Sequence, residues 1–442
     1  MSGALSLHPL LSNAARAADL RPIAPAGPHF PAKAKHLIFV FLTGGVSHVD
    51  SFDEKPALLR DQGKLVDGPN LRGTTKSPLQ PSPFKFAKHG ESGLVLSELF
   101  PHLASVADDL CVIRSMHTDI VEHFQASLAM HTGSATVPLP SIGSWLSYGL
   151  GSDNRNLPPH IVFCEHLPYG GSQLWDSNFL PPEHQGSRLI PGNEPIPNLK
   201  PIVENVKLRM LEAQLLDEVN ASFDAARPGD LVARARTESF KIARGMMEIA
   251  PRVLDFSDET AATLAAYGVK SGDRKSFAWQ CLAARRLTEH GVRVVEIIDT
   301  GASDDWDAHG DMQQHRPKAL CVDQALAALI HDLKQRGLFE ETLIAVCTEF
   351  GRTPFDPGRG RNHWHRAFTC LLSGAGVRGG LAHGTTDDYG IEVVENGVHV
   401  HDYHATILHL LGIDHERLTY RFAGRDFRPT DVAGNVVNAI LA

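Results

Sequence analysis

The sequence has little of what marks several large classes of protein. Its 442 residues include only six cysteines, which are widely spaced and form no CxxC pair, so nothing indicates a disulfide framework. Basic residues (42) are fewer than acidic ones (51), and the net charge of −9 argues against a nucleic-acid partner. No apolar run reaches the roughly 20 residues that a membrane-spanning helix needs. The chain is therefore predicted to be globular, without a membrane span, and its oligomeric state is left open.

The start of the chain lacks the positive charge of a complete export signal. Residues 1–18 contain a modest apolar stretch that ends in small residues, like the second half of a secretory signal. The protein is therefore expected in the cytoplasm if Met1 is the true start, and outside it if the true start lies upstream. We interpret residues 1–34 as a signal remnant or linker before one domain at 35–442.

Short apolar runs recur along the rest of the chain. The run HLIFVFL after Lys35, closed by two glycines, is typical of a strand buried on both faces. An amphipathic helix is expected at 317–337. Further strands are predicted at 110–114, 160–164, 292–298, 342–347 and 368–372. Because strands and helices alternate, we predict an α/β fold whose mostly parallel central sheet carries helices on both faces.

Two segments depart from this alternation. Residues 203–290 carry apolar residues at helical spacing, which predicts a helical insertion or cap. Residues 54–95 are polar and rich in Pro and Gly, and we expect them to form loops.

Four polar clusters lie next to predicted strands, at 44–53, 304–309, 348–353 and 361–365. In a doubly wound sheet the functional loops lie beyond the carboxyl ends of the strands. Carboxylates and neutral imidazoles are ligands that zinc, manganese and iron accept. The co-location of the four clusters therefore predicts a metal site at this edge of the sheet.

The motifs in and around these clusters resemble those of a known family. The segments concerned are GGVSHVDSFDEKP, HFQASLAMHTG, WDAH, TEFGRTP, GRNHW and FAGRDFRPTDVAG. Together they resemble the uncharacterised bacterial domain-of-unknown-function family 1501, from about Lys35 to the C-terminus. The resemblance implies an alkaline phosphatase- or sulfatase-like fold. It also favours an exported or periplasmic protein, because members commonly begin with a twin-arginine export signal. The segment LSLHPLLSNAARA resembles the tail of such a signal.

The resemblance also implies a set of metal ligands. Asp305 and His309 have the spacing of the ligands of one superfamily metal, and His363 matches its distant histidine. Asp307, within WDAH, is the acid that the closer family indicates. A divalent metal is expected, with zinc favoured and manganese or calcium as the other candidates.

The second metal position of the superfamily is less complete here. Glycines stand where an Asp is expected after the first strand, and Glu349 takes the place of the Asp of an Asp-His pair. Glu349 would add a ligand or orient water. His48 and Asp50 are the alternative ligands near the first strand.

The largest departure concerns the nucleophile. The superfamily places Ser, Thr or Cys ten residues before the glycine of a helix ending in Thr-Gly, and this position is His123. His123 is a candidate nucleophile, general base or metal ligand, with capping of its helix as the structural alternative. Ser127, one turn later, shares its face. Arg352 is a candidate for anion recognition, because a guanidinium fork matches phosphate or sulfate oxygens.

The favoured interpretation is a metal-dependent hydrolase of phosphate or sulfate esters, with a small-molecule or carbohydrate ester as substrate. The missing hydroxyl or thiol nucleophile favours an alternative, a non-catalytic metal- or ligand-binding protein on a degenerate alkaline phosphatase-like fold. A mutase or transferase acting on a carbohydrate, with residues 203–290 as a lid, is a third.

Overall fold

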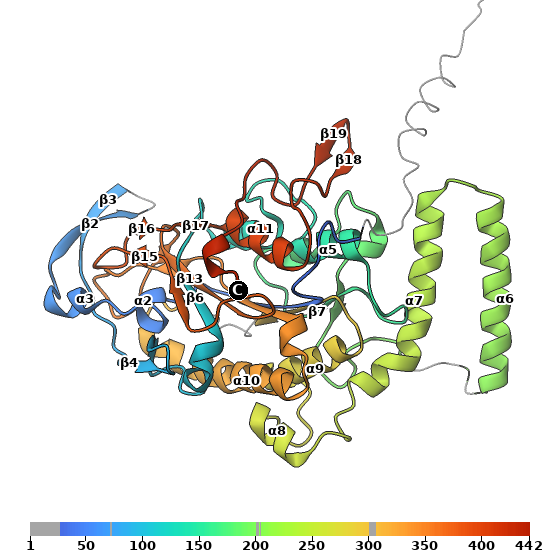
Figure 1. The fold of residues 1–442 in the computed structure, drawn as a ribbon, viewed down its shortest axis with the longest axis horizontal. Coiled ribbons are helices and arrows are strands. Elements are labelled where there is room, and N and C mark those ends of the chain that lie inside the picture. Colours follow the sequence, from blue (N-terminus) through green and yellow to red (C-terminus); the bar gives the residue numbers. More distant parts are fainter. Residues whose placement is uncertain (1–26, 71–72, 200–202, 204, 300–305) are drawn as a thin grey trace, which may run out of the picture.

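The computed structural model describes residues 27–70, 73–199, 203, 205–299 and 306–442 (Figure 1). The expected signal remnant at 1–18 and the candidate ligand Asp305 lie outside these residues. Across the part of the chain that is described, no helix combines the length and the apolar character needed to cross a membrane.

A nine-stranded sheet forms the centre of the molecule. In spatial order its strands are β14 (Leu381–His383), β6 (Leu110–His117), β13 (Phe368–Gly374), β10 (Thr342–Cys347), β1 (His36–Leu42), β9 (Val294–Asp299), β7 (His160–Phe163) and β8 (Ser187–Leu189), while β17 (Val398–His399) pairs with the end of β6. All pairings are parallel except those of β13, which runs antiparallel to β6 and β10. The predicted α/β fold with a mostly parallel sheet is confirmed.

The central strand β1 shows why the sheet carries helices on both faces. All seven of its residues are buried, and side chains alternate between the two faces of a strand. Ile38 and Val40 join one apolar core, whereas Phe39 and Phe41 join the other. An uninterrupted apolar run is what a strand covered on both sides requires.

The covering helices belong to one core or the other (Figure 1). The core that includes Ile38 contains residues of α9 (Phe277–Glu289) and α10 (His315–Gln335). The core that includes Phe39 contains residues of α4 (His123–Thr132), α5 (Ile142–Leu150) and α11 (Val400–Leu410). The helix predicted at 317–337 is α10.

The prediction of loops at 54–95 was wrong in part. This segment contains the short helix α3 (Pro56–Arg60) and two antiparallel ribbons, β2 (Leu65–Asn70) with β3 (Gly73–Pro78) and β4 (Phe86–His89) with β5 (Leu94–Ser97). The strands β4 and β5 have only four residues each, which is too short for a clear alternation of apolar and polar residues. The remaining small elements are α2 (His48–Ser51), β11 (Gly351–Arg352) with β12 (His363–Trp364), β15 (Thr385–Thr386) with β16 (Val393–Glu395), β18 (Tyr420–Phe422) with β19 (Arg425–Phe427), and the 3-10 helices Leu103–Asp109, Gly171–Trp175, Pro182–His184, Met312–Gln314, Phe339–Glu341 and Asn438–Ile440.

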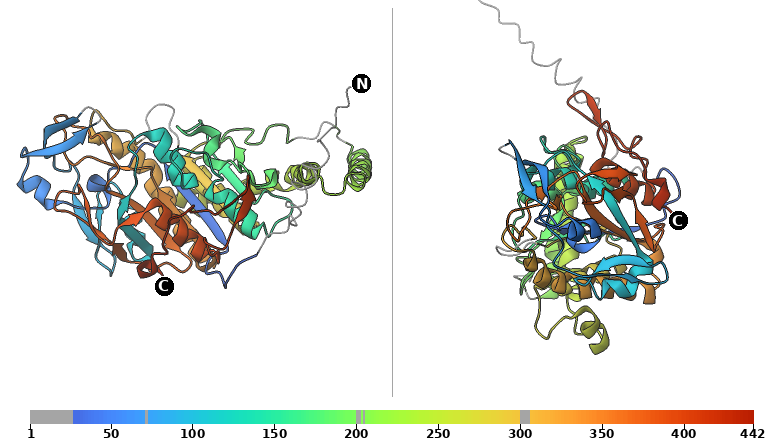
Figure 2. Two further views of the ribbon diagram at one scale, coloured as in Figure 1. Left: turned by 90° about the horizontal axis from the view of Figure 1, so that it is seen from above. Right: turned by 90° about the vertical axis from the view of Figure 1, so that its left-hand side faces the viewer.

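The region predicted as a helical insertion divides into two parts. The helices α6 (Val206–Ala225) and α7 (Leu231–Val253) form a hairpin that projects from one end of the molecule, and α8 (Ala261–Tyr267) follows it (Figures 1 and 2). The hairpin stands at the opposite end from α2, which follows the loop after β1, so it does not lie over that loop as a lid. By contrast, α9 packs on the sheet as part of its covering layer.

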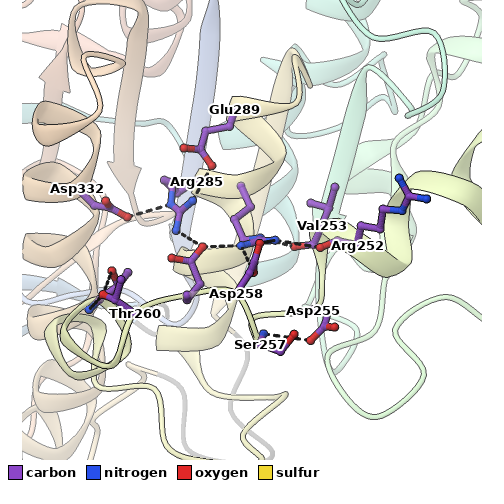
Figure 3. Close-up of polar contacts among 12 residues, drawn as sticks. Arg252, Val253, Asp255, Ser257, Asp258, Thr260, Arg285, Glu289 and Asp332 are labelled. Atoms are coloured by element: carbon purple, nitrogen blue, oxygen red, sulfur yellow. Dashed lines mark hydrogen bonds and ion pairs between the residues drawn. The ribbon is translucent and has the colours of Figure 1, made fainter.

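A network of buried ion pairs fastens the base of this region to the sheet layer (Figure 3). Arg285 of α9 is 1% exposed, and each of its three guanidinium nitrogens lies 2.5–2.9 Å from a carboxylate oxygen of Glu259, Glu289 or Asp332. Burial on its own would lower the pKa of Arg285, but the hydrogen bond that it donates to Glu259 and the charges of Glu289 and Asp332 hold that pKa above its usual value. The hydroxyl of Tyr267 also donates to Asp332, at 3.1 Å.

The neighbouring Arg286 closes the turn between α7 and α8. Its Nε donates to the carbonyl of Val253 and its Nη2 to that of Arg252, at 2.8 and 2.9 Å. Its Nη1 lies 2.8 Å from Asp258 and 2.5 Å from Glu259. Two adjacent arginines of α9 therefore bind both the end of α7 and the loop that follows it (Figure 3).

Candidate metal centre

The candidate site is built where strands end. His123 begins α4 shortly after β6, Asp307 and His309 follow β9, and Glu349 follows β10. His363 lies on the short strand β12, which pairs with β11. Since β6, β10, β1 and β9 all run in one direction, their carboxyl ends meet at one edge of the sheet, and side chains distant in sequence come together there.

Asp307 is the centre of this group. Its Oδ1 lies 2.9 Å from His309 Nε2 and 3.2 Å from His363 Nε2, and its Oδ2 lies 3.4 Å from His123 Nε2. One ligand atom each from His123, Asp307 and His363 lies within 4.8 Å of the others. The sequence had pointed to His309 as the partner of Asp307 and His363. The structure adds His123 to this group and places His309, whose side chain is 47% exposed, beside it.

The imidazoles of His123 and His363 have fixed orientations. His363 Nδ1 donates to the carbonyl oxygen of Val121 at 2.9 Å, and its Nε2 faces Asp307 Oδ1 at 3.2 Å. His123 Nδ1 lies 2.7 Å from Glu349 Oε1, and its Nε2 faces Asp307 Oδ2 at 3.4 Å. Metal-binding histidines have this arrangement, with one ring nitrogen held by the protein and the other free to bind.

Glu349 holds His123 in place. Its side chain is fully buried, and its oxygens accept hydrogen bonds from the backbone N–H of Gly44 at 2.8 and 3.1 Å and of Gly45 at 3.2 Å. These glycines stand where the superfamily has an acidic ligand. A Cβ at Gly45, which has φ +81°, would meet the ring of Phe350 at 2.7 Å. With both oxygens engaged, Glu349 orients an imidazole and does not face the gap between the three ligand atoms.

Arg352 fixes Asp307 from the other side. Its guanidinium is fully buried, and its Nη2 lies 2.5 Å from Asp307 Oδ1. Its remaining donors go to backbone carbonyls, with Nε 2.9 Å from Gly45, Nη1 3.1 Å from Arg361 and Nη2 also donating to Gly44. Arg352 therefore orients the central carboxylate, and four of its five N–H donors are engaged within the protein.

Charge in the group favours a cation between the carboxylates. Burial alone would lower the pKa of His123, but hydrogen bonds to Asp307 and Glu349 outweigh it and raise that pKa to about 9. Burial alone would raise the pKa of Asp307, but hydrogen bonds from His123, His309 and His363 and the charge of Arg352 hold it far below its usual value. The protonated imidazole of His123 then occupies the position where a metal ion would supply the positive charge.

The other predicted residues near the first strand have structural partners. Asp50 is fully buried and accepts hydrogen bonds from Arg361 at 2.7 and 3.2 Å and from Ser47 at 2.5 Å. His48 Nε2 lies 2.8 Å from the carbonyl oxygen of Gly390. Neither belongs to the group of closely spaced ligand atoms found among the described residues. Ser127, one turn after His123 on α4, is fully buried.

Two contacts of His123 could not be anticipated. The ring of Tyr169 stacks on His123, with centroids 4.3 Å apart and planes inclined by 12°, and Phe350 contacts the same imidazole at 4.8 Å. Tyr169 lies in a loop after β7, far in sequence from every motif. A single tyrosine in a Pro-Tyr-Gly-Gly sequence does not indicate that its ring will stack on a distant histidine. Phe350 lay within a recognised motif, but its role had no sequence signature.

The comparison with protein families agrees with the sequence motifs. The model of the family described as "Protein of unknown function (DUF1501)" matches residues 34–441, and the chain belongs to this family. A comparison with curated protein sequences found no match.

Solved structures similar to this chain include members of the alkaline phosphatase and sulfatase superfamily. The lipoteichoic acid synthase LtaP from Listeria monocytogenes has a TM-score of 0.37 and 10% identity, with 87% of this chain and 74% of that chain covered. The PsFucS1 sulfatase from Pseudoalteromonas sp. has a TM-score of 0.37 and 11% identity, with 87% and 68% covered. A mutant of TAB5 alkaline phosphatase with bound Mg has a TM-score of 0.34 and 11% identity, with 86% and 98% covered.

Proposed function

We propose that this protein is a metal-dependent hydrolase of phosphate or sulfate esters, and that His123, Asp307 and His363 hold its metal. One observation carries the proposal, the convergence of three ligand atoms within 4.8 Å of one another. The other ring nitrogens of both histidines are engaged by Glu349 and by the Val121 carbonyl. Asp307 adds a carboxylate oxygen to these imidazoles, so the three residues offer the mixed nitrogen and oxygen donors that divalent metals accept.

The chemistry of the donors supports zinc. Two imidazoles and one carboxylate are the three protein ligands of one common type of catalytic zinc site, which keeps its fourth position open. Calcium prefers six to eight oxygen ligands, which this group does not offer, so manganese is the closer alternative. A divalent ion held there would act as a Lewis acid toward an ester oxygen of the substrate.

The residues around the ligands have separate tasks in this proposal. Arg352 and Glu349 position Asp307 and His123, as carboxylates and other groups behind metal ligands commonly do. His309 is half-exposed and lies 3.1 Å from His363 Nε2, so it is the imidazole placed to exchange a proton with a substrate or with water. The proposed substrate is a small-molecule or carbohydrate ester.

Two observations favour the alternative of a non-catalytic metal-binding protein. Four of the five N–H donors of Arg352 are used within the protein, and Ser127 is buried away from solvent. If neither the guanidinium of Arg352 nor the hydroxyl of Ser127 contacts a substrate, the protein would bind metal at this site without catalysing ester hydrolysis.

Elemental analysis of the purified full-length protein, with assays on aryl phosphate and aryl sulfate esters in zinc, manganese and calcium, tests the proposal. We expect stoichiometric metal in the wild type and in the control His331→Ala, whose imidazole is exposed on α10, and loss of both metal and hydrolysis in His363→Ala. Absence of stoichiometric metal from the wild type overturns the metal site. A protein that binds metal and hydrolyses none of the esters supports the binding alternative.

A further inference from the structure

The helix α6 exposes an unusual amount of apolar surface. None of its 20 residues is buried. Eight large apolar side chains on it are 44–68% exposed, namely Val206, Leu208, Met210, Leu211, Leu215, Leu216, Val219 and Phe223. Helices of globular proteins normally turn such residues toward a core, and large exposed patches commonly mark an interaction surface.

The contact with α7, the neighbouring helix, does not use these residues. The half-buried positions of α6 are Arg209, Ala213, Asn220 and Asp224, which lie on one face of a helix with 3.6 residues per turn. On the same side, Asp217 pairs with Arg244 of α7 at 3.0 Å. The hairpin is therefore held together through a polar and small-residue face.

The opposite face of α6 carries a regular apolar stripe. Leu208, Leu211, Leu215 and Val219 follow one another at intervals of three, four and four residues, the spacing of a helix–helix seam. The stripe is nearly symmetric about Leu215. Leu211 and Val219 lie four residues on either side of it, and Leu208 and the small Ser222 lie seven. A stripe with this symmetry complements a second copy of itself that runs in the opposite direction, as a two-fold interface requires.

We propose that two copies of this chain associate through α6, with the two helices antiparallel and Leu215 at the two-fold axis. Because α6 is the outermost helix of a hairpin that projects from the body of the molecule, a partner can approach it without meeting the sheet or its covering helices (Figures 1 and 2). The two hairpins together would form a four-helix arrangement.

The area is also that of a stable pair. A helix of 20 residues is about 30 Å long. If about six apolar side chains on each copy each lose on the order of 100 Å² of accessible surface, the pair buries about 1,200 Å² in total, at the lower end of specific interfaces.

The mass of the full-length protein in solution, measured by light scattering or sedimentation, tests the association. We expect a species of twice 48.1 kDa for the wild type and a monomer for the double variant Leu211→Glu/Leu215→Glu. Glutamate favours helices about as well as leucine, so the helical circular dichroism should not change. The matched control is Leu59→Glu on α3, which is 69% exposed and outside the hairpin, and it should remain dimeric.

Cysteine cross-linking tests the direction, in a Cys321→Ser background because Cys321 is the exposed native cysteine. Leu215→Cys should cross-link to itself, whereas Leu208→Cys should cross-link with Ser222→Cys in mixed dimers and poorly with itself. Efficient self-linking of Leu208→Cys would show a parallel pair and overturn the proposal. A wild type that stays monomeric also overturns it, and binding of that monomer to phospholipid vesicles through the same leucines would identify a lipid surface as the occupant instead.

Discussion

Two clusters of buried charge in this molecule are built on different principles. Around Arg285, three guanidinium nitrogens face three carboxylates, and Arg286 completes the network with one further carboxylate and two backbone carbonyls. Around Asp307, one carboxylate meets a guanidinium and three imidazoles. One ligand atom each from His123, Asp307 and His363 lies within 4.8 Å of the others.

The two clusters differ in role: the charged side chains around Arg285 hold elements of the fold together, whereas we propose that those around Asp307 bind a ligand. A buried ion is tolerated when partners satisfy it, which describes Arg285. Closely grouped imidazole and carboxylate atoms are the ligands that divalent metals accept. We therefore propose that the cluster around Asp307 is the functional one, although both clusters draw charged side chains from several elements.

The largest effect is expected from Arg285→Met. The substitution removes the common partner of the buried Glu259 and Asp332 and of the more exposed Glu289, so we expect a loss of about 3–5 kcal/mol in the free energy of unfolding. Urea denaturation measures it. The control Arg421→Met removes a half-exposed ion pair with Asp426 and should cost at most about 1 kcal/mol. Equal losses in the two variants would remove the distinction between the network and an ordinary surface pair.

Zinc should stabilise the protein through the Asp307 cluster alone. At about 100 times the dissociation constant, a ligand that binds only the folded state adds about 2.7 kcal/mol. We expect this gain in the wild type and in Arg336→Met, which weakens the other network, because the two clusters share no residue. His363→Ala should gain nothing in the same thermal or urea titrations. A zinc-dependent gain that survives in His363→Ala contradicts the assignment.

Glu349→Gln tests the support behind His123. Loss of such a carboxylate typically lowers metal affinity about 10–100-fold, since the imidazole is no longer held in orientation. Competition with a chromogenic chelator measures the change, and Glu341→Gln, at a half-exposed carboxylate, is the control. An unchanged metal affinity would mean that Glu349 only accepts the hydrogen bonds of the Gly44 and Gly45 backbone and does not support the metal site.

The smallest effect is expected from His309→Ala. Its side chain is 47% exposed and it lies beside the three grouped ligands, so we expect less than a tenfold loss of metal affinity, against complete loss for His123→Ala. The reverse result would restore the ligand set that spacing alone indicated, with His309 in place of His123.

Sequence by itself determined the layers of this protein and the edge of the sheet where chemistry gathers. The apolar run of β1 required cover on both faces, the clusters around Asp307 and Glu349 follow strands whose carboxyl ends meet, and the cluster around His363 precedes the next predicted strand. These features are local or follow from strand direction, so one chain sufficed to find them.

Only the tertiary structure decided which of these side chains touch. His123 and Asp307 are far apart in sequence, and their contact depends on how α4 lies against the loop after β9. The same holds for Asp50, whose position suited a ligand until Arg361, 311 residues away, was found to neutralise it. A carboxylate or an imidazole has the same local pattern whether it binds a metal or an arginine, because its role depends on partners that the fold brings from distant segments.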